Sequence, residues 1–103
     1  MNKLEIKKQF VDLGKRANVA KMPFNFTGKN ISEEDVTLTI VAPCGCTVTQ
    51  KEKIVKAGEI FHIAGYLKKR DHLGVVKKLI RITVKGTKEK YTLIYQMDLV
   101  KAG

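Results

Sequence analysis

Two cysteines separated by a single glycine are the most chemically distinctive feature of this sequence. Cys44 and Cys46 could bind one soft metal ion, or they could cycle between a dithiol and a disulfide. Zinc normally takes four ligands, and the two histidines, His62 and His72, lie at separations unlike those of zinc fingers or ribbons. A thiol or metal-binding protein that uses Cys44 and Cys46 is therefore an alternative rather than the main prediction.

Packing is the simpler explanation for the same two cysteines. Pro43 and Gly45 should interrupt regular strand pairing, and the small cysteine side chains are commonly buried. The N-terminal residues offer no apolar stretch typical of a signal peptide, so we expect no secretion by that route. The thiols should stay reduced in a cytosol, although a virus particle outside its host could oxidise them. We therefore expect Cys44 and Cys46 to fill the core where a strand leaves its sheet.

Positive charge is concentrated in the second half of the chain. The 103 residues include 20 Lys and Arg against 10 Asp and Glu, which gives a net charge of +10. Positions 51–90 hold twelve basic and four acidic residues, and so carry +8 of that total. Such an excess attracts phosphates or an acidic protein surface. The candidate contact residues are Lys68, Lys69, Arg70, Lys77, Lys78, Arg81, Lys85, Lys88 and Lys90.

Nucleic-acid modules usually add exposed stacking aromatics to such a basic surface. This chain has four Phe, three Tyr and no Trp, and most of them fall at positions phased with the core. An acidic protein partner is therefore our first expectation, and a basic nucleic-acid-binding module is a further alternative. Lysines of this kind also protect strand edges from pairing.

Motifs for catalysis or for membrane insertion are missing from the sequence. It has no Gly-rich phosphate loop, no nucleophile elbow and no His-Glu-x-x-His. No apolar run approaches the roughly 18 residues of a membrane span. We therefore expect no enzyme activity, no cofactor and no membrane partner.

Apolar and polar residues alternate with a period of two, which predicts strands, and no window has helical spacing. The β-branched run at 36–42 is the strongest example, and it leads directly into the cysteines. Turns are predicted at 27–30 and 56–59, and a loop at 68–72. The other predicted strands begin at Leu4 or cover 22–26, 59–67, 74–84 and 91–100. Residues 1–103 should thus form one all-β domain, an immunoglobulin-like antiparallel β-sandwich of about seven strands.

The order of these features resembles that of a known family. An aromatic strand ends at Gly28, a second runs into Cys44-Gly45-Cys46-Thr47, a turn follows at 57–59, Gly74 opens a strand, and a hairpin ends the chain. This order is similar to that of a bacterial and phage family of unknown function, which is defined by a Cys-Gly-Cys-Thr signature and related to hydin-like immunoglobulin-type domains. The resemblance covers about residues 10–100, and it implies an immunoglobulin-type sandwich with an interaction role.

These observations predict a non-enzymatic structural or interaction module that is one subunit of a larger assembly. The resemblance makes a phage virion the concrete expectation, with the chain as a capsid decoration or a head or tail accessory protein. Its partners would be other protein subunits with acidic surfaces, and its location would be the cytoplasm or the virion.

Overall fold

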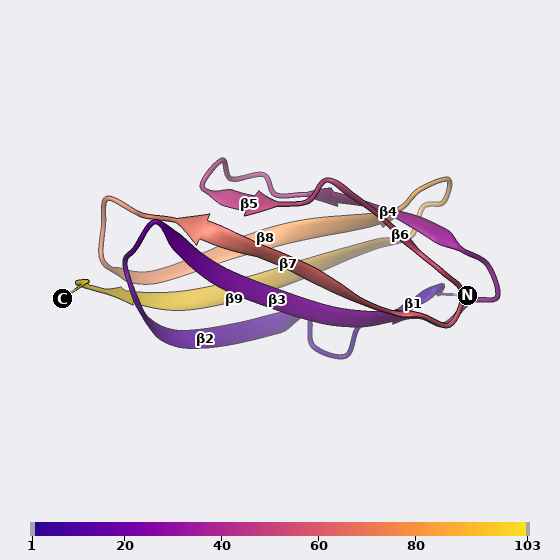
Figure 1. Ribbon diagram of the computed structural model, residues 1–103, viewed down its shortest axis with the longest axis horizontal. Helices are drawn as coiled ribbons and strands as arrows, with labels where there is room; N and C mark the ends of the chain where they lie inside the picture. Colours follow the sequence, from indigo (N-terminus) through magenta and orange to yellow (C-terminus); the bar gives the residue numbers. More distant parts are fainter. Residues whose placement is uncertain (1, 103) are drawn as a thin grey trace.

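Nine β-strands make up the computed structural model, which describes residues 2–102 (Figure 1). They form two sheets, which we call sheet A, with four strands, and sheet B, with five. Sheet A has the order β1 (Leu4–Glu5), β3 (Lys21–Asn30), β7 (Ile60–Lys68) and β5 (Thr47–Thr49). Sheet B has the order β2 (Phe10–Ala17), β9 (Lys90–Val100), β8 (Gly74–Val84), β4 (Val36–Val41) and β6 (Glu52–Val55). Within this described range, no helix is long and apolar enough to cross a membrane.

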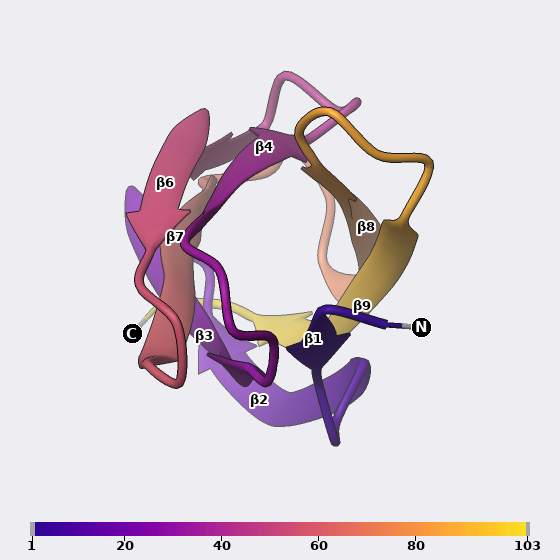
Figure 2. The same ribbon diagram turned by 90° about the vertical axis from the view of Figure 1, so that its right-hand side faces the viewer.

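Apolar side chains alternate along the strands, so each sheet turns one face toward the other (Figure 2). Met22, Phe24 and Phe26 of β3 all point inward, as the alternation predicted. Tyr95 of β9 stacks on Phe24 across the core, with ring centroids 4.5 Å apart. Burying one side chain of this size stabilises the fold by roughly 1.5–3 kcal/mol relative to leaving it exposed. The predicted all-β sandwich is therefore confirmed.

Most of the long strands lie where the alternation placed them. The strands predicted at 36–42, 59–67, 74–84 and 91–100 correspond to β4, β7, β8 and β9. The turn predicted at 56–59 is also present, because Glu59 N–H donates to the Lys56 carbonyl over 3.0 Å and Gly58 has a φ of 76°. The single domain predicted for residues 1–103 remains a prediction, and Met1 and Gly103 lie outside the described residues.

Three details of the predicted topology are wrong. The sandwich has nine strands rather than about seven, because the short strands β5 and β6 and the irregular strand β2 lack sustained alternation. It is not purely antiparallel, since β2 pairs with β9 in parallel, with a register shift between Asp12 and Lys15. The turn predicted at 27–30 belongs to β3, where Gly28 pairs with Phe61. A Cβ at Gly28 would collide with the Phe61 ring, so this glycine permits close packing.

The N-terminal segment divides its pairing between the two sheets. In sheet A, Leu4 and Glu5 of β1 pair antiparallel with Asn30 and Lys29 of β3. The chain then crosses over, and β2 pairs with β9 in sheet B. Because β1 is only two residues long, its ladder with β3 ends at Lys29. The rest of that edge of β3 has no strand partner among the described residues.

Replacing Gly65 tests the close packing of β7 against its neighbours. A Cβ at this position would lie 2.8 Å from Phe24 Cζ and 3.2 Å from Thr49 Cα, and it would also collide with the Val48 carbonyl. We expect Gly65→Ala to lower the free energy of unfolding by about 1–3 kcal/mol, measured as a shift of the urea midpoint.

Gly45→Ala is the matched control for this substitution. A Cβ at Gly45 meets no atom within 4 Å, and this glycine is not among those with positive φ. Its midpoint should therefore stay within about 0.5 kcal/mol of the wild type. Equal midpoints for the two variants would contradict the close packing around Gly65.

Candidate functional site

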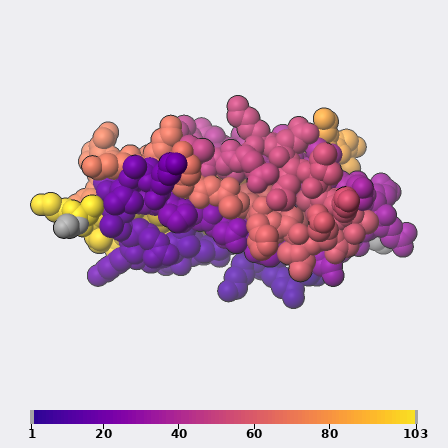
Figure 3. Space-filling view, viewed as in Figure 1, coloured from indigo at the N-terminus to yellow at the C-terminus, as the bar shows by residue number. Residues whose placement is uncertain are grey.

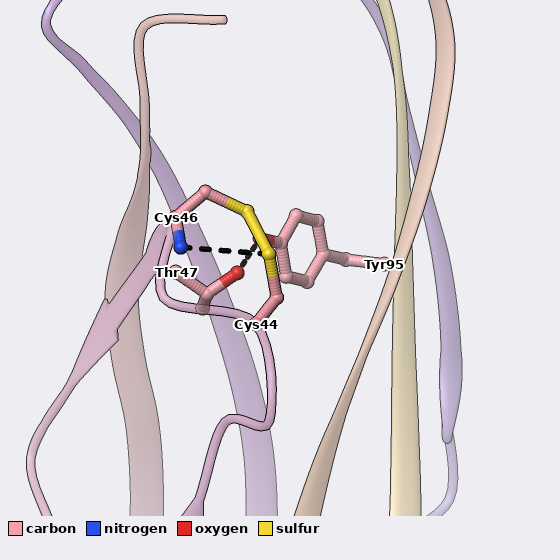
Figure 4. Close-up of a disulfide and its surroundings, with 4 residues drawn as sticks. All are labelled: Cys44, Cys46, Thr47 and Tyr95. Carbon is pink, nitrogen blue, oxygen red and sulfur yellow. Dashed lines mark hydrogen bonds between the residues drawn. A yellow bond between two sulfur atoms is a disulfide. The ribbon is translucent and has the colours of Figure 1, made fainter.

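Cys44 and Cys46 are joined by a disulfide in the segment between β4 and β5 (Figure 4). Their location at a strand end is as predicted. Of the two states that the sequence left open, the structure has the disulfide rather than the thiols expected in a cytosol. Both residues are only partly buried, so they do not fill the core as expected. Cys46 does pack against the hydrophobic core, whereas Cys44 is not part of that cluster.

Backbone hydrogen bonds hold the segment that contains the disulfide. Thr47 N–H donates to the Cys44 carbonyl over 3.1 Å, and Lys68 N–H donates to the Cys46 carbonyl over 2.8 Å. The disulfide itself closes a loop of only three residues, 44–46. In the chain-entropy model such a loop contributes about 1.6 kcal/mol, against about 4.7 kcal/mol for a loop of 100 residues. The disulfide therefore stabilises the fold less than one that closes a long loop would.

A buried hydrogen bond below the disulfide links the two sheets (Figure 4). The Thr47 and Tyr95 hydroxyl oxygens lie 2.6 Å apart, with Thr47 in sheet A and Tyr95 in sheet B. Burial raises the pKa of Tyr95, while the hydrogen bond with Thr47 and the positive charge of Arg70 act in the opposite direction. The neutral Tyr95 hydroxyl is thus available at physiological pH as the partner of Thr47.

The two histidines do not join the cysteines, as their separations in the sequence indicated. His62 lies on the outer face of β7, where its Nδ1 is 3.2 Å from Thr27 Oγ1, and His72 is exposed in the loop after β7. Among residues 2–102, no group of three or more His, Cys, Asp or Glu side chains could hold a metal ion. Metal binding by Cys44 and Cys46 stays a prediction, and it requires the disulfide to be reduced first.

The predicted basic residues do not gather into one patch. One group lies at the end of β7 and in the following loop, and another lies in the β8–β9 hairpin at the opposite end of β8 (Figure 1). The 11 residues of β8 separate these groups by about 33 Å. The groups are Lys68, Lys69 and Arg70 at one end, Lys77, Lys78 and Arg81 along β8, and Lys85, Lys88 and Lys90 at the other end. Their role in partner contact stays a prediction.

A groove of about 440 Å³ lies beside the edge of β3 that has no strand partner among the described residues. Val11, Phe26 and Ile60 supply apolar lining, and four charged residues complete its walls. One wall is the β1–β2 connection, which projects from the lower margin of the molecule in Figure 3. The charged residues are Glu5, Lys7, Lys8 and Lys29. No sequence pattern indicated this groove, because it arises where the N-terminal segment changes sheets.

A carboxylate anchors the β1 wall of this groove. Glu89 accepts hydrogen bonds from Lys3 N–H at 2.9 and 3.0 Å and from Leu4 N–H at 3.3 Å, and it also accepts one from the Tyr91 hydroxyl. Burial acts to raise the pKa of Glu89, but the hydrogen bonds outweigh it and hold the pKa below its ordinary value of 4.5. Burial and the neighbouring Glu89 raise the pKa of Tyr91 to about 12.

Glu89→Gln should weaken the attachment of β1. We expect a loss of about 1–3 kcal/mol of unfolding free energy at pH 7, since hydrogen bonds to a charged acceptor are replaced by neutral ones. Because folding lowers the pKa of Glu89, its stabilisation is present above pH 4.5 and is lost as the pH falls through the folded-state pKa. Urea unfolding at pH 7 and pH 3 should therefore show that the unfolding free energy of Glu89→Gln falls less between these pH values than that of the wild type. Glu33→Gln, at an exposed site, is the control and should retain the wild-type pH dependence.

Tyr95→Phe should destabilise the protein by about 1–2 kcal/mol, because the buried Thr47 hydroxyl loses its partner. Replacing both partners, in Thr47→Val with Tyr95→Phe, should cost less than the sum of the two single substitutions. Urea unfolding of all four proteins in the cycle measures this coupling. Strictly additive losses would show that the hydrogen bond contributes nothing.

Several solved structures share this fold at low sequence identity. The ASH/PapD-like domain 7 of human CEP192 matches with a TM-score of 0.73 and 13% identity, over 98% of this chain and 87% of that one. A putative carbohydrate-binding protein from Bacteroides ovatus matches with a TM-score of 0.73 and 6% identity, over 94% of this chain and 37% of that one. The Vibrio cholerae VesB protease matches with a TM-score of 0.62 and 17% identity, over 94% of this chain and 32% of that one. This chain therefore spans only about a third of the latter two proteins.

The similarity to a PapD-like domain confirms the predicted immunoglobulin-like sandwich. A search of curated proteins by sequence finds no match. A family model described as "Protein of unknown function (DUF1573)" matches residues 4–99, which run from the first residue of β1 almost to the end of β9. The chain therefore belongs to the DUF1573 family.

Proposed function

We propose that this domain is a non-enzymatic interaction module that binds an extended, acidic segment of a partner protein along the open edge of β3. The groove beside that edge is the observation that carries the proposal. An unpaired strand edge, an apolar lining and lysines occur there together. Each of them favours one property of such a ligand: an extended backbone, an apolar side chain and a negative charge.

The pairing pattern of β3 identifies the backbone groups that would receive the ligand. Asn30 N–H donates to the backbone carbonyl of Glu59 on the β7 side, whereas Ile31 N–H donates to the backbone carbonyl of Lys3 on the β1 side. Because this direction alternates along a strand, Asn25 and Thr27 turn their backbone groups toward the β1 side, beyond the end of the β1 ladder. An added strand would therefore hydrogen-bond to Asn25 and Thr27.

The charges around the groove favour an acidic ligand. Lys7, Lys8 and Lys29 are exposed at its walls, against the single carboxylate of Glu5. The net charge of +10 on the whole chain would also steer an acidic partner toward the domain. Binding should therefore weaken as the salt concentration rises.

The proposal places the domain in a larger protein assembly, in the cytoplasm or in a virion. A phage capsid decoration or a head or tail accessory protein is its most specific form, and this form depends on the sequence resemblance alone. Mass spectrometry of purified particles, together with gel filtration of a native lysate, tests this form. A monomer that joins no particle or complex would contradict it.

The groove itself can be tested with a blocked peptide of alternating Glu and Val residues. We expect fluorescence anisotropy to show binding that weakens with salt, and NMR to show the largest amide shifts at Asn25 and Thr27. The double variant Lys7→Glu/Lys8→Glu should bind about 10-fold more weakly, since attraction becomes repulsion.

Lys68→Glu/Lys69→Glu is the matched control, because it makes the same charge change at exposed sites at the end of β7 opposite the groove residue Ile60. Equal losses of peptide affinity in the two double variants would show that net charge, rather than the groove, governs binding. Tighter binding of a duplex or single-stranded DNA than of the peptide would favour the nucleic-acid alternative.

A further inference from the structure

The disulfide segment is held in place by interactions other than the disulfide. Hydrogen bonds from Thr47 N–H and Lys68 N–H fix the carbonyls of Cys44 and Cys46, and Thr47 is further tied to Tyr95. These bonds involve backbone and hydroxyl groups, so they remain available when the sulfurs are reduced. Opening the disulfide therefore frees a loop of three residues and leaves its anchors in place.

The two sulfur atoms differ in their surroundings. Both residues are partly buried, but Cys46 packs against the hydrophobic core, whereas Cys44 lies outside that cluster. Gly45 is exposed, and a Cβ there would meet no atom within 4 Å, so the loop is open on that side. An incoming thiolate could thus reach Cys44 more readily than Cys46.

The same surroundings favour a thiolate at Cys44 after reduction. Cys46 N–H donates to Cys44 Sγ over 3.4 Å, and such a bond is stronger to a charged sulfur (Figure 4).

We propose that Cys44 and Cys46 form a redox centre that exchanges with the thiols of a partner while the sandwich stays folded. A partner thiolate attacks Sγ of Cys44, the bond between Cys44 and Cys46 breaks, and its electron pair leaves on Cys46 Sγ. A second partner thiolate then attacks the partner's sulfur in the mixed disulfide and releases Cys44 as a thiolate. Two electrons pass from the partner, which becomes a disulfide, to this domain, which becomes a dithiol. The reverse sequence starts with Cys44 as the nucleophile.

This redox centre does not depend on the proposed peptide groove. The disulfide lies beside Lys68 at the end of β7, whereas the groove includes Ile60 at the start of that strand. The two proposals can therefore fail separately.

Reduction of the folded protein is the first test. Oxidised protein is incubated at pH 7 with dithiothreitol in one arm and with glutathione redox buffers in another, then quenched with acid, alkylated and weighed by mass spectrometry. We expect full reduction by dithiothreitol within minutes without urea, with an unchanged far-ultraviolet circular dichroism spectrum. The glutathione arm should show partial reduction that follows the buffer ratio.

Single-cysteine variants test the assigned roles of the two sulfurs. Cys46→Ser retains Cys44, which lies outside the core cluster, and Cys44→Ser retains Cys46, which packs against it. After treatment with oxidised glutathione, Cys46→Ser should form its mixed disulfide about 10-fold faster than Cys44→Ser, because its sulfur is more accessible and more often ionised. Iodoacetamide alkylation at several pH values should give the lower thiol pKa for Cys46→Ser.

Two kinds of result would overturn the proposal, one from each experiment. A disulfide that is reduced only in urea, or that unfolds the protein as it is reduced, would be a structural crosslink. Equal glutathione rates in the two variants, or a faster rate in Cys44→Ser, would refute the role assigned to Cys44.

Discussion

The passage of the N-terminal segment from one sheet to the other is the constraint that shapes this molecule. A sandwich must protect the edges of both of its sheets, and here one segment serves both. Its first two-residue strand covers the end of β3 at Asn30, and the strand that starts at Phe10 covers β9. The segment is too short to pair fully with β3 as well. The partly open edge of β3, and the groove beside it, are the structural consequence.

The two edge strands of sheet A, β1 and β5, are attached in different ways. At the β1 end, the Glu89 carboxylate ties Lys3 and Leu4 to the β8–β9 hairpin through charge-assisted hydrogen bonds. At the β5 end, a neutral hydrogen bond joins Thr47 to Tyr95 inside the core. Only the first of these attachments includes a carboxylate, whose pKa is held below 4.5 and which acid protonates. Acid should therefore loosen the groove wall before it affects the segment that carries the disulfide.

The sequence predicted the long strands because one of their faces is buried, and burial imposes an alternation that can be recognised locally. Val36–Val41 and Gly74–Val84 are examples. Gly28 was mistaken for a turn residue because the approach of the Phe61 ring depends on a strand more than thirty positions away. The groove and the division of the basic residues between the two ends of β8 could not be predicted from the sequence either, since both follow from the topology. The cysteine pair was recognised, but its bonding state was not encoded in its spacing.

Distance along the sandwich separates the chemistry of the disulfide from the binding surface at β3. Groups more than about 7–10 Å apart that share no partners usually act additively. The groove residue Ile60 and the disulfide neighbour Lys68 lie at opposite ends of β7, a nine-residue strand that spans roughly 27 Å. Between them, β7 stays paired with β3 from Lys29 to Lys21, and none of that ladder involves the sulfurs. Reduction of Cys44 and Cys46 would therefore change the reactivity of one end of the domain without altering the edge that is proposed to bind a partner at the other.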